Sequence, residues 1–251
     1  MLASMRLFRF LLLPLLLVFL LPLGAHAAWW MAHDHPASWS AANWSSSGVL
    51  PAADASREAQ VLVFAARTGR WKGIFAHHSW IVLKPAGAAD YVRYDKVGWG
   101  RPVRKNGWAA DALWYGNRPE LIGKAVGAEA EALIPRIEAA IAAYPHNRNG
   151  GYNVWPGPNS NTFVAHVLAQ VPELDAVLPP TAIGKDWTEG LAFGASPSGT
   201  GFRFSIAGLF GVTLGWVEGV EVNLLGAVLG LDIRRPALKL PGFGRLGVPV
   251  V

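Results

Sequence analysis

The sequence predicts an α+β protein in which a mainly antiparallel sheet packs against about two helices and carries a β-rich carboxyl-terminal extension. Apolar runs of strand length occur at residues 59–67, 75–85 and 90–100, and the PAGAA segment between the last two is typical of a hairpin. Apolar residues then recur with helical spacing in two later segments. The last third has short runs rich in glycine, valine and aromatic residues, which is typical of further hairpins.

The two helices are expected at residues 127–145 and 159–171. The first contains GAEAEALIPRIEAAIAAYP, and Pro145 ends it. The second begins at Asn159, a good N-cap residue, and ends before Pro172. One apolar stripe identifies each helix: Ala130, Leu133, Ile134, Ile137 and Ile141 in the first, and Phe163, Val164, Val167, Leu168 and Val171 in the second.

Composition excludes several kinds of chemistry. The chain has 251 residues, 52% of them hydrophobic, and no cysteine. It therefore has no disulfide, no thiolate nucleophile, no thiolate zinc site and no iron–sulfur cluster. The formal charge is +5, of which Arg6 and Arg9 supply two, and the remaining basic residues are scattered. We interpret this charge as a solubility feature and expect no nucleic-acid partner.

The amino terminus predicts export. Residues 1–27 combine a basic start, the apolar run FLLLPLLLVFLLPLG and the small-x-small site Ala25-His26-Ala27, as in a signal peptide. An uncleaved membrane anchor is the alternative, because AWWM extends the apolar stretch. Both predict a location in the periplasm, or in the inner membrane facing the periplasm.

The rest of the chain is expected to form one domain. Residues 28–58 have no clear periodicity and are interpreted as a linker or a surface segment. Residues 59–190 form the predicted core, and residues 191–251 its β-rich extension, ending in a proline-punctuated tail. The pair His33 and His35 lacks a third ligand, so no metal and no cofactor are expected.

The stretch PGPNSNTFVAHVL, residues 156–168, carries the strongest candidate site. Ser160 falls in the first helical turn, where free backbone N–H groups and the helix dipole stabilise negative charge. His166 is about 240° around the helix from Ser160 and is therefore not its partner. The candidate base comes from the predicted strand that starts with His77 and His78, whose side chains alternate between the two faces of the sheet.

These motifs resemble those of the circularly permuted papain-like hydrolases and acyltransferases, a group that includes NlpC-type and lecithin:retinol acyltransferase-like enzymes. HSWIV (residues 78–82) is similar to the strand motif His-x-x-Ile-hydrophobe, and NSNTFV (residues 159–164) to the helix motif Asn-Cys-x-x-Phe-Val. The resemblance implies a permuted papain-like core, with His78 as base and Ser160 in the position of the nucleophilic cysteine.

Four longer stretches of the chain are also distinctive: WPGPNSNTFVAHVL, LPPTAIGKD, VEVNLLG and RPALKLPG. Together they resemble an uncharacterised bacterial family, domain of unknown function 3750. This resemblance brings no known activity with it.

Two functional hypotheses follow. In the first, the protein hydrolyses or transfers an amide or ester of the cell envelope, with Ser160 as nucleophile, His78 as base, and Asp95 or Tyr94 orienting the imidazole. In the second, the same cleft binds an envelope peptide, glycan or lipid without turnover. Four further residues are candidates for the binding surface: Asn159, His77, Trp80 and Trp155.

Overall fold

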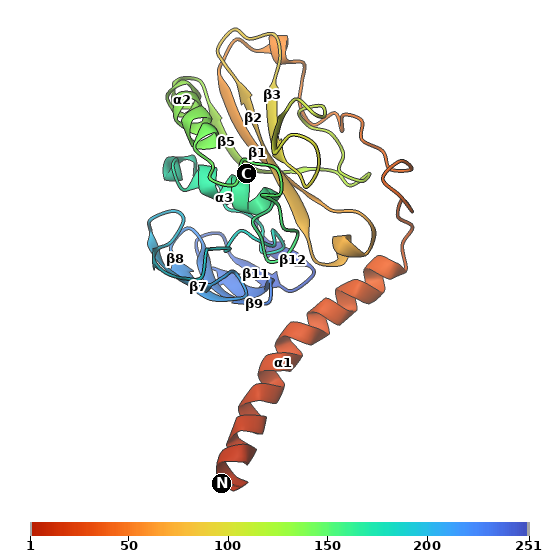
Figure 1. Cartoon of the computed structure of the whole chain (residues 1–251), viewed down its shortest axis with the longest axis vertical. Helices are drawn as coiled ribbons and strands as arrows, with labels where there is room; N and C mark the ends of the chain where they lie inside the picture. The colour runs from red at the N-terminus through yellow and green to blue at the C-terminus, as the bar shows by residue number, and fades with distance from the viewer. Residues whose placement is uncertain (1, 250–251) are drawn as a thin grey trace.

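The computed structural model describes residues 2–249, with side chains from residue 13 onward except at positions 14 and 15. Figure 1 shows a long first helix that projects from a body built on two antiparallel sheets. The α+β class, the antiparallel pairing and the β-rich carboxyl-terminal part are as the sequence predicts.

The first sheet has five strands in the order β4-β3-β2-β1-β5. The predicted hairpin between β2 and β3 is present, with Ile81 opposite Tyr94. The sheet also contains β4 and β5, for which the sequence analysis predicted no strand. The strand bounds are Gln60–Arg67 (β1), His77–Lys84 (β2), Val92–Lys96 (β3), Val103–Lys105 (β4) and Glu120–Val126 (β5).

Each face of this sheet has its own core. Helices α2 (Ala128–Ala142) and α3 (Ser160–Leu168) cover one face, where Ile81 and Leu83 of β2 pack with Phe163 and Val164. The other face is covered by loops rich in tryptophan, with Trp80, Trp114 and Phe64 buried there. The predicted surface segment before β1 contributes to this cover, because Ser46 pairs with Ala112, and Ser46, Val49 and Leu50 donate to the Asp111 carboxylate.

The last third forms a separate sheet of seven strands in the order β12-β11-β10-β9-β8-β7-β6. The hairpins that the sequence predicts here are present and pair in sequence with one another, and the proline-punctuated tail supplies the last two strands. The bounds are Leu191–Ala195, Gly201–Ile206, Phe210–Gly215, Gly219–Leu224, Ala227–Asp232, Ala237–Leu240 and Gly244–Gly247 for β6 to β12.

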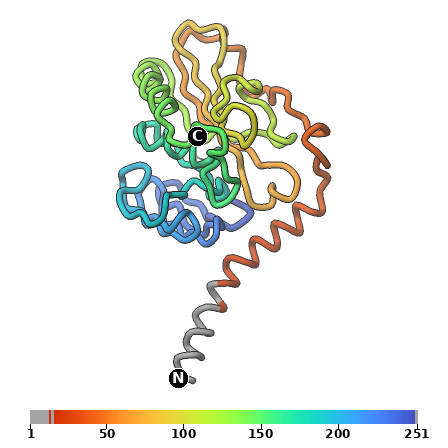
Figure 2. Tube along the Cα trace, in the orientation of Figure 1, coloured from red at the N-terminus to blue at the C-terminus, as the bar shows by residue number. Residues whose placement is uncertain are grey.

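Helix α1 (Leu2–Met31) runs without a break through the predicted cleavage site. Its carboxyl-terminal end is packed on the body: His26 is buried and its ring meets Phe243 edge-on, and the Trp30 indole N–H donates to the Arg70 carbonyl at 3.0 Å. The tube in Figure 2 shows the helix extending away from this contact. Among helices whose residues are described, none is both long and apolar enough to cross a bilayer.

Candidate functional site

A cavity of about 960 Å³ surrounds the start of β2. Most of its wall is apolar, and much of it is aromatic. Its polar lining includes His77 and His78 from β2, Ser160 from α3 and Tyr152 from the preceding loop. The two groups that the sequence motifs select as nucleophile and base therefore line one cavity, and no hydrogen bond joins them within the described structure. An apolar cavity with a few convergent polar groups is typical of a ligand site.

His78 is held by a buried carboxylate. Its Nε2 lies 2.8 Å from Oδ1 of Asp95, and both side chains are shielded from solvent. Asp95 is in turn bound by Arg93, whose Nε and Nη2 donate to the two carboxylate oxygens at 2.7 and 2.8 Å. Burial favours a raised pKa for the Asp95 carboxyl, but the Arg93 charge and the hydrogen bonds from His78 and Arg93 outweigh it and lower that pKa.

This arrangement fixes the tautomer of His78. An ionised carboxylate only accepts hydrogen bonds, so Nε2 of His78 carries the proton and Nδ1 carries the lone pair. Within the described residues, Nδ1 has no protein hydrogen-bond partner. Burial lowers the pKa of His78, and Asp95 offsets only part of that effect, so the ring is neutral at pH 7. A neutral imidazole with a free lone pair is a competent base.

Aromatic rings pack against the imidazole of His78. The Trp114 ring is stacked on His78 with the centroids 3.7 Å apart and the planes 7° from parallel. Trp80 lies behind it, with the Arg93 guanidinium 3.9 Å above the Trp80 ring. Planar partners on a buried imidazole and guanidinium leave both little freedom to turn.

Ser160 is the first residue of α3, and the N-cap before it is fully engaged. The Asn159 side chain accepts from the N–H groups of Asn161 and Thr162 and donates to the carbonyls of Val154 and Ile183. We expected free N–H groups near Ser160 to form an oxyanion hole. Two of them are instead satisfied by Asn159, so the Ser160 N–H is the one that remains at this turn.

Ser160 lies beside the phenol of Tyr152. Burial raises the pKa of Tyr152, and the hydroxyl and N–H of Ser160 partly offset the increase, so the phenol stays protonated at neutral pH. Tyr152 lies in a loop with no periodicity, and the sequence analysis did not select it. The hydroxyl pair of Ser160 and Tyr152 sits on the wall of the cavity.

Asn161 connects the start of α3 to β2. Its Nδ2 donates to the His77 carbonyl at 2.9 Å and to the Ile183 carbonyl, and its Oδ1 accepts from the Ser79 hydroxyl at 2.7 Å. These bonds attach the residue after Ser160 to the residues on both sides of His78. The position of Ser160 relative to His78 is therefore fixed through the backbone, although the His78 side chain lies on the sheet face opposite α3.

The other predicted site residues have different surroundings. Tyr94 is on the helix side of the sheet, so Asp95 is the one of the two that contacts His78. His77 also faces the helices, and its Nδ1 is 2.7 Å from the Thr181 hydroxyl. Trp80 is buried in the core outside the cavity wall, whereas the half-exposed Trp155 lines the cavity and donates to the Leu225 carbonyl.

Two further residues near His78 are absent from the predicted site. Arg93 carries a detectable signal, because residues two apart on a strand share a face and Arg93 therefore lies beside Asp95. Trp114 carries no such sequence signal, because it lies in a loop and only the tertiary fold brings it into contact with His78. Within the described residues, no cluster of histidine and acidic side chains suits a metal ion.

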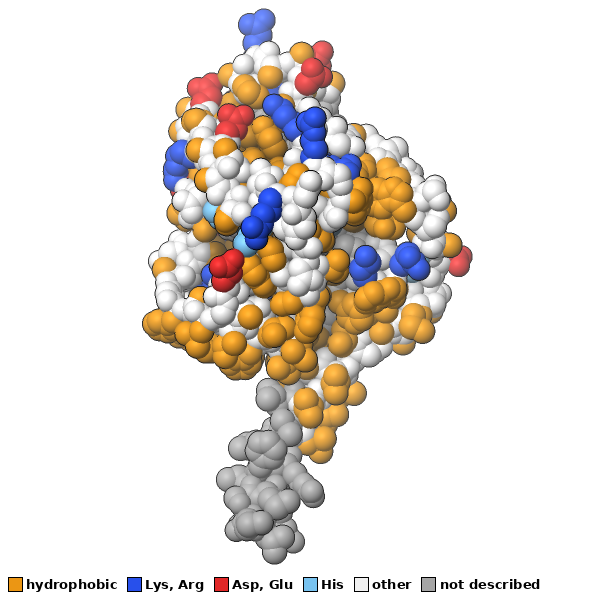
Figure 3. Space-filling model, viewed as in Figure 1, with side chains coloured by type: hydrophobic (Ala, Val, Ile, Leu, Met, Phe, Trp, Pro, Cys, Tyr) orange, Lys and Arg blue, Asp and Glu red, His pale blue; other side chains and the backbone are white. Residues whose placement is uncertain are grey.

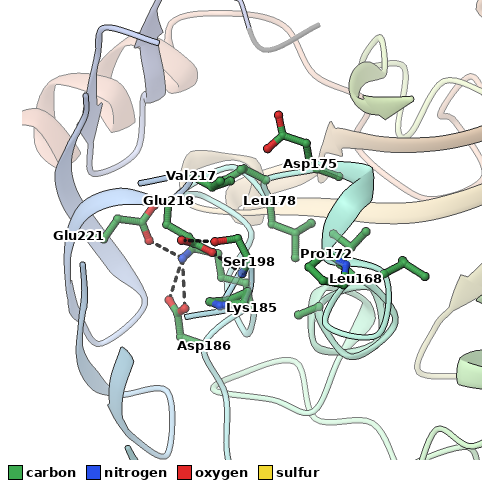
Figure 4. Close-up of a pocket in the computed structure, with 15 residues that line it drawn as sticks. Leu168, Pro172, Asp175, Leu178, Lys185, Asp186, Ser198, Val217, Glu218 and Glu221 are labelled. Carbon is green, nitrogen blue, oxygen red and sulfur yellow. Dashed lines mark hydrogen bonds and ion pairs between the residues drawn. The ribbon is translucent and has the colours of Figure 1, made fainter. Parts of the chain in front are cut away.

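A second, small pocket between the end of α3 and the second sheet is lined by charges that already pair with each other (Figure 4). Lys185 contacts both Asp186 and Glu221, and Glu221 also binds Lys239 at 2.6 Å. Glu218 accepts from the hydroxyl and N–H of Ser198. These side chains are engaged in contacts within the protein, so we assign them a structural role.

Comparison with known proteins identifies the family. No curated protein and no solved structure that was compared with the chain matches it. One family model, described as "Protein of unknown function (DUF3750)", matches residues 58–187, which include β1 to β5, both packed helices, His78, Asp95 and Ser160. That span is 130 of the 251 residues, more than half of the chain. The chain therefore belongs to the DUF3750 family.

Proposed function

We propose that the protein is a serine-dependent hydrolase or acyltransferase that acts on an amide or ester with an apolar portion. One observation carries the proposal: His78 is held by the buried Asp95 as a neutral base, and it lines the same cavity as Ser160 at the start of α3. This arrangement supports a permuted papain-like core with serine in the cysteine position. The largely apolar cavity suits an acyl chain or a similar group.

The proposed reaction begins with attack of the Ser160 Oγ on the substrate carbonyl carbon. Nδ1 of His78 takes the hydroxyl proton, and the anionic Asp95 stabilises the imidazolium that forms. The negative oxygen of the tetrahedral intermediate receives hydrogen bonds from the Ser160 N–H and the Tyr152 hydroxyl. The intermediate collapses as the imidazolium protonates the leaving amine or alcohol, and water or an acceptor alcohol then releases the acyl group.

An activity-based probe tests this assignment. A fluorophosphonate is expected to label the protein at Ser160, and Ser160→Ala and His78→Ala are expected to abolish labelling. Ser40→Ala, a change at an exposed serine far along the chain, is the matched control and is expected to label normally. Labelling that persists in Ser160→Ala, or that is unaffected in His78→Ala, contradicts the proposal.

The second candidate is a binding protein without turnover. The observation that favours it is the serine in place of cysteine, because a hydroxyl needs a base for activation where a thiol is already partly ionised near neutral pH. In that case a fluorescent fatty acid binds equally well to the protein and to Ser160→Ala, and no probe labelling is seen with the unaltered chain.

We propose an exported location with α1 retained as an anchor. The support is the burial of His26 and Trp30, which makes the predicted cleavage region part of the packed body. The intact mass of the protein recovered from membranes tests this: retention predicts the full-length chain, whereas cleavage after Ala27 predicts the loss of residues 1–27.

A further inference from the structure

The seven-stranded sheet has its polar and apolar faces reversed relative to an ordinary sheet in water. Alternation along β7 directs Arg203 and Ser205 toward the body, where Ser205 is fully buried. The alternate residues of the same strand, Phe202 and Ile206, are exposed. A half-buried antiparallel sheet normally shows the opposite pattern, with apolar residues inside and polar residues outside.

The pairing register extends this outward apolar face over all seven strands. Ile206 of β7 pairs with Leu191 of β6 and with Phe210 of β8. At the other edge, Leu238 of β11 pairs with Leu231 of β10 and with Leu246 of β12. Across β6–β12, all of which the structure describes, every outward position in these registers is apolar or glycine. We call this surface the outer face of the second sheet.

The inward side explains why the reversal is stable. Glu221, Asn223 and Lys239 point inward from β9 and β11 and are buried. Lys239 binds Glu221, and Asn223 donates to Asp186 and to the Gly208 carbonyl. The polar groups therefore satisfy each other inside the protein, and the apolar side chains remain outside, with Phe193 73% and Leu191 69% exposed. A contiguous apolar patch of this kind marks an interaction surface.

We propose that the outer face of the second sheet docks on the surface of a phospholipid bilayer. Three features select a bilayer as the occupant. The first is α1, which contacts β10 and β11 and projects from the side of the body where hydrophobic side chains gather (Figure 3). Leu13, Leu17 and Leu21 of this helix are exposed. A bilayer covers both the apolar helix and the apolar sheet. A second copy of the chain, packed sheet against sheet, covers only the sheet.

The second feature is the short helix η2 (Arg70–Ile74), which packs against α1. It carries the exposed Arg70, then Trp71, which is 62% exposed, and then Lys72. Tryptophan is favoured at the membrane–water interface, and lysine and arginine attract anionic headgroups. The edge of the docking region that borders α1 therefore matches the headgroup layer.

The third feature is the cavity. Leu224 and Leu240 belong to the outer face by register and also line the cavity, together with Leu16, Phe19 and Leu20 of α1. The apolar wall of the cavity is thus continuous with the outer face. A protein docked in this way takes an acyl chain from the bilayer without exposing it to water. This inference stands independently of any reaction at Ser160.

The absence of cysteine makes a direct test possible. Phe193→Cys in the full-length chain carries a polarity-sensitive fluorophore on the outer face, and Ala139→Cys carries it on the exposed side of α2. With vesicles of phosphatidylcholine and phosphatidylglycerol, the label at position 193 is expected to shift to the blue and to be quenched by lipids with a quencher in the acyl chain. The label at position 139 is expected to do neither.

A triple variant separates the outer face from α1. Phe193→Ser with Phe202→Ser and Ile206→Ser is expected to weaken vesicle binding at least tenfold, while Ala132→Ser with Ala139→Ser and Ala142→Ser on α2 leaves it unchanged. Equal binding of both variants, or vesicle binding without any change of the label at position 193, overturns the proposal and leaves α1 as the attachment. A concentration-dependent blue shift at position 193 without vesicles also overturns it, in favour of a second copy of the chain.

Discussion

Nε2 of His78 and Oδ1 of Asp95 are 2.8 Å apart in a region closed to solvent, and Arg93 holds the opposite side of the carboxylate. The pair sets both the orientation and the tautomer of the imidazole. Much of the chemistry proposed for the cavity therefore depends on a group that does not itself face the substrate.

Asp95→Asn tests this dependence. The amide has the shape of the carboxylate but can donate to Nε2, which favours the tautomer whose lone pair faces away from the cavity. The rate constant of Ser160 labelling is expected to fall by about 10⁴-fold, as the same exchange does in the Ser-His-Asp triad of serine proteases. Because the buried Arg93 loses its counter-ion, the free energy of unfolding is also expected to fall, by about 3–5 kcal/mol. Labelling at the normal rate by the folded variant contradicts the orienting role.

The pH dependence of labelling follows from the lowered pKa of His78. Because burial places this pKa below the ordinary value of 6.5, the neutral base is fully present at pH 7 and is lost only as the pH falls through the lowered value. The labelling rate constant is expected to be flat between pH 8 and pH 6.5 and to decline below that range. A midpoint above pH 7, in a protein that circular dichroism shows to be folded, is incompatible with this environment.

Ser160→Cys introduces the only thiol in the chain, so its titration has no background. The start of α3 and the nearby His78 both favour a thiolate, and its pKa is expected to lie below the ordinary value of about 8.5. In the double variant with His78→Ala, the pKa is expected to rise. Thiol alkylation rates measured against pH give both values. A pKa at or above 8.5 that does not respond to His78 shows that the helix start serves only folding.

Asn161→Ala removes the link between α3 and β2. The change leaves the Ser79 hydroxyl and two buried carbonyls without their partner, and each such loss costs about 1–3 kcal/mol. A decrease of about 2–4 kcal/mol in the free energy of unfolding is expected by denaturant titration. Gln170→Ala, at an exposed position just after the same helix, is the control and is expected to stay within about 0.5 kcal/mol of the unaltered chain.

Alanine substitutions at two glycines test the packing of α1 on the body. A Cβ at Gly73 would overlap the Trp30 ring, whereas a Cβ at Gly24, within α1, meets no atom. Gly73→Ala is therefore expected to release the end of α1 and to expose the peptide bonds after Trp29 and Trp30 to chymotrypsin. Gly24→Ala is expected to keep the protection and to favour the helix by about 1 kcal/mol. Equal cleavage of the two variants contradicts the packed arrangement.

Local periodicity accounts for the elements that the sequence predicted correctly. Strands β1, β2 and β3 and helices α2 and α3 each carry an apolar pattern that matches their period. Strand β5, with the sequence ELIGKAV, is interrupted by glycine and lysine, and its strand structure depends on pairing with β1. The reversed polarity of the second sheet depends on buried contacts such as the one between Glu221 and Lys239. These two residues are 18 positions apart in the sequence, so local periodicity does not indicate that they pair.

The candidate site, too, was predictable only where a local sequence pattern determines the position of a side chain. Strand alternation reduced the orienting group to Asp95 or Tyr94, and the pairing of β2 with β3 decides in favour of Asp95. Tyr152 and Trp114 lie in loops, where neither spacing nor periodicity indicates a position in space. The helix start was recognised, but the use of its N–H groups by Asn159 was not, because that depends on side-chain geometry.

The contacts of Arg67 and Lys185 connect the family region, residues 58–187, to the carboxyl-terminal part of the chain. The Arg67 guanidinium in β1 donates to the carbonyls of Gly242 and Phe243, and Lys185 is paired with Glu221. A fragment restricted to residues 58–187 would keep both cations but lose these acceptors, so that Arg67 retains only the Gly73 carbonyl and Lys185 only Asp186. We therefore expect truncation after residue 187 to destabilise the family region and to give an insoluble product.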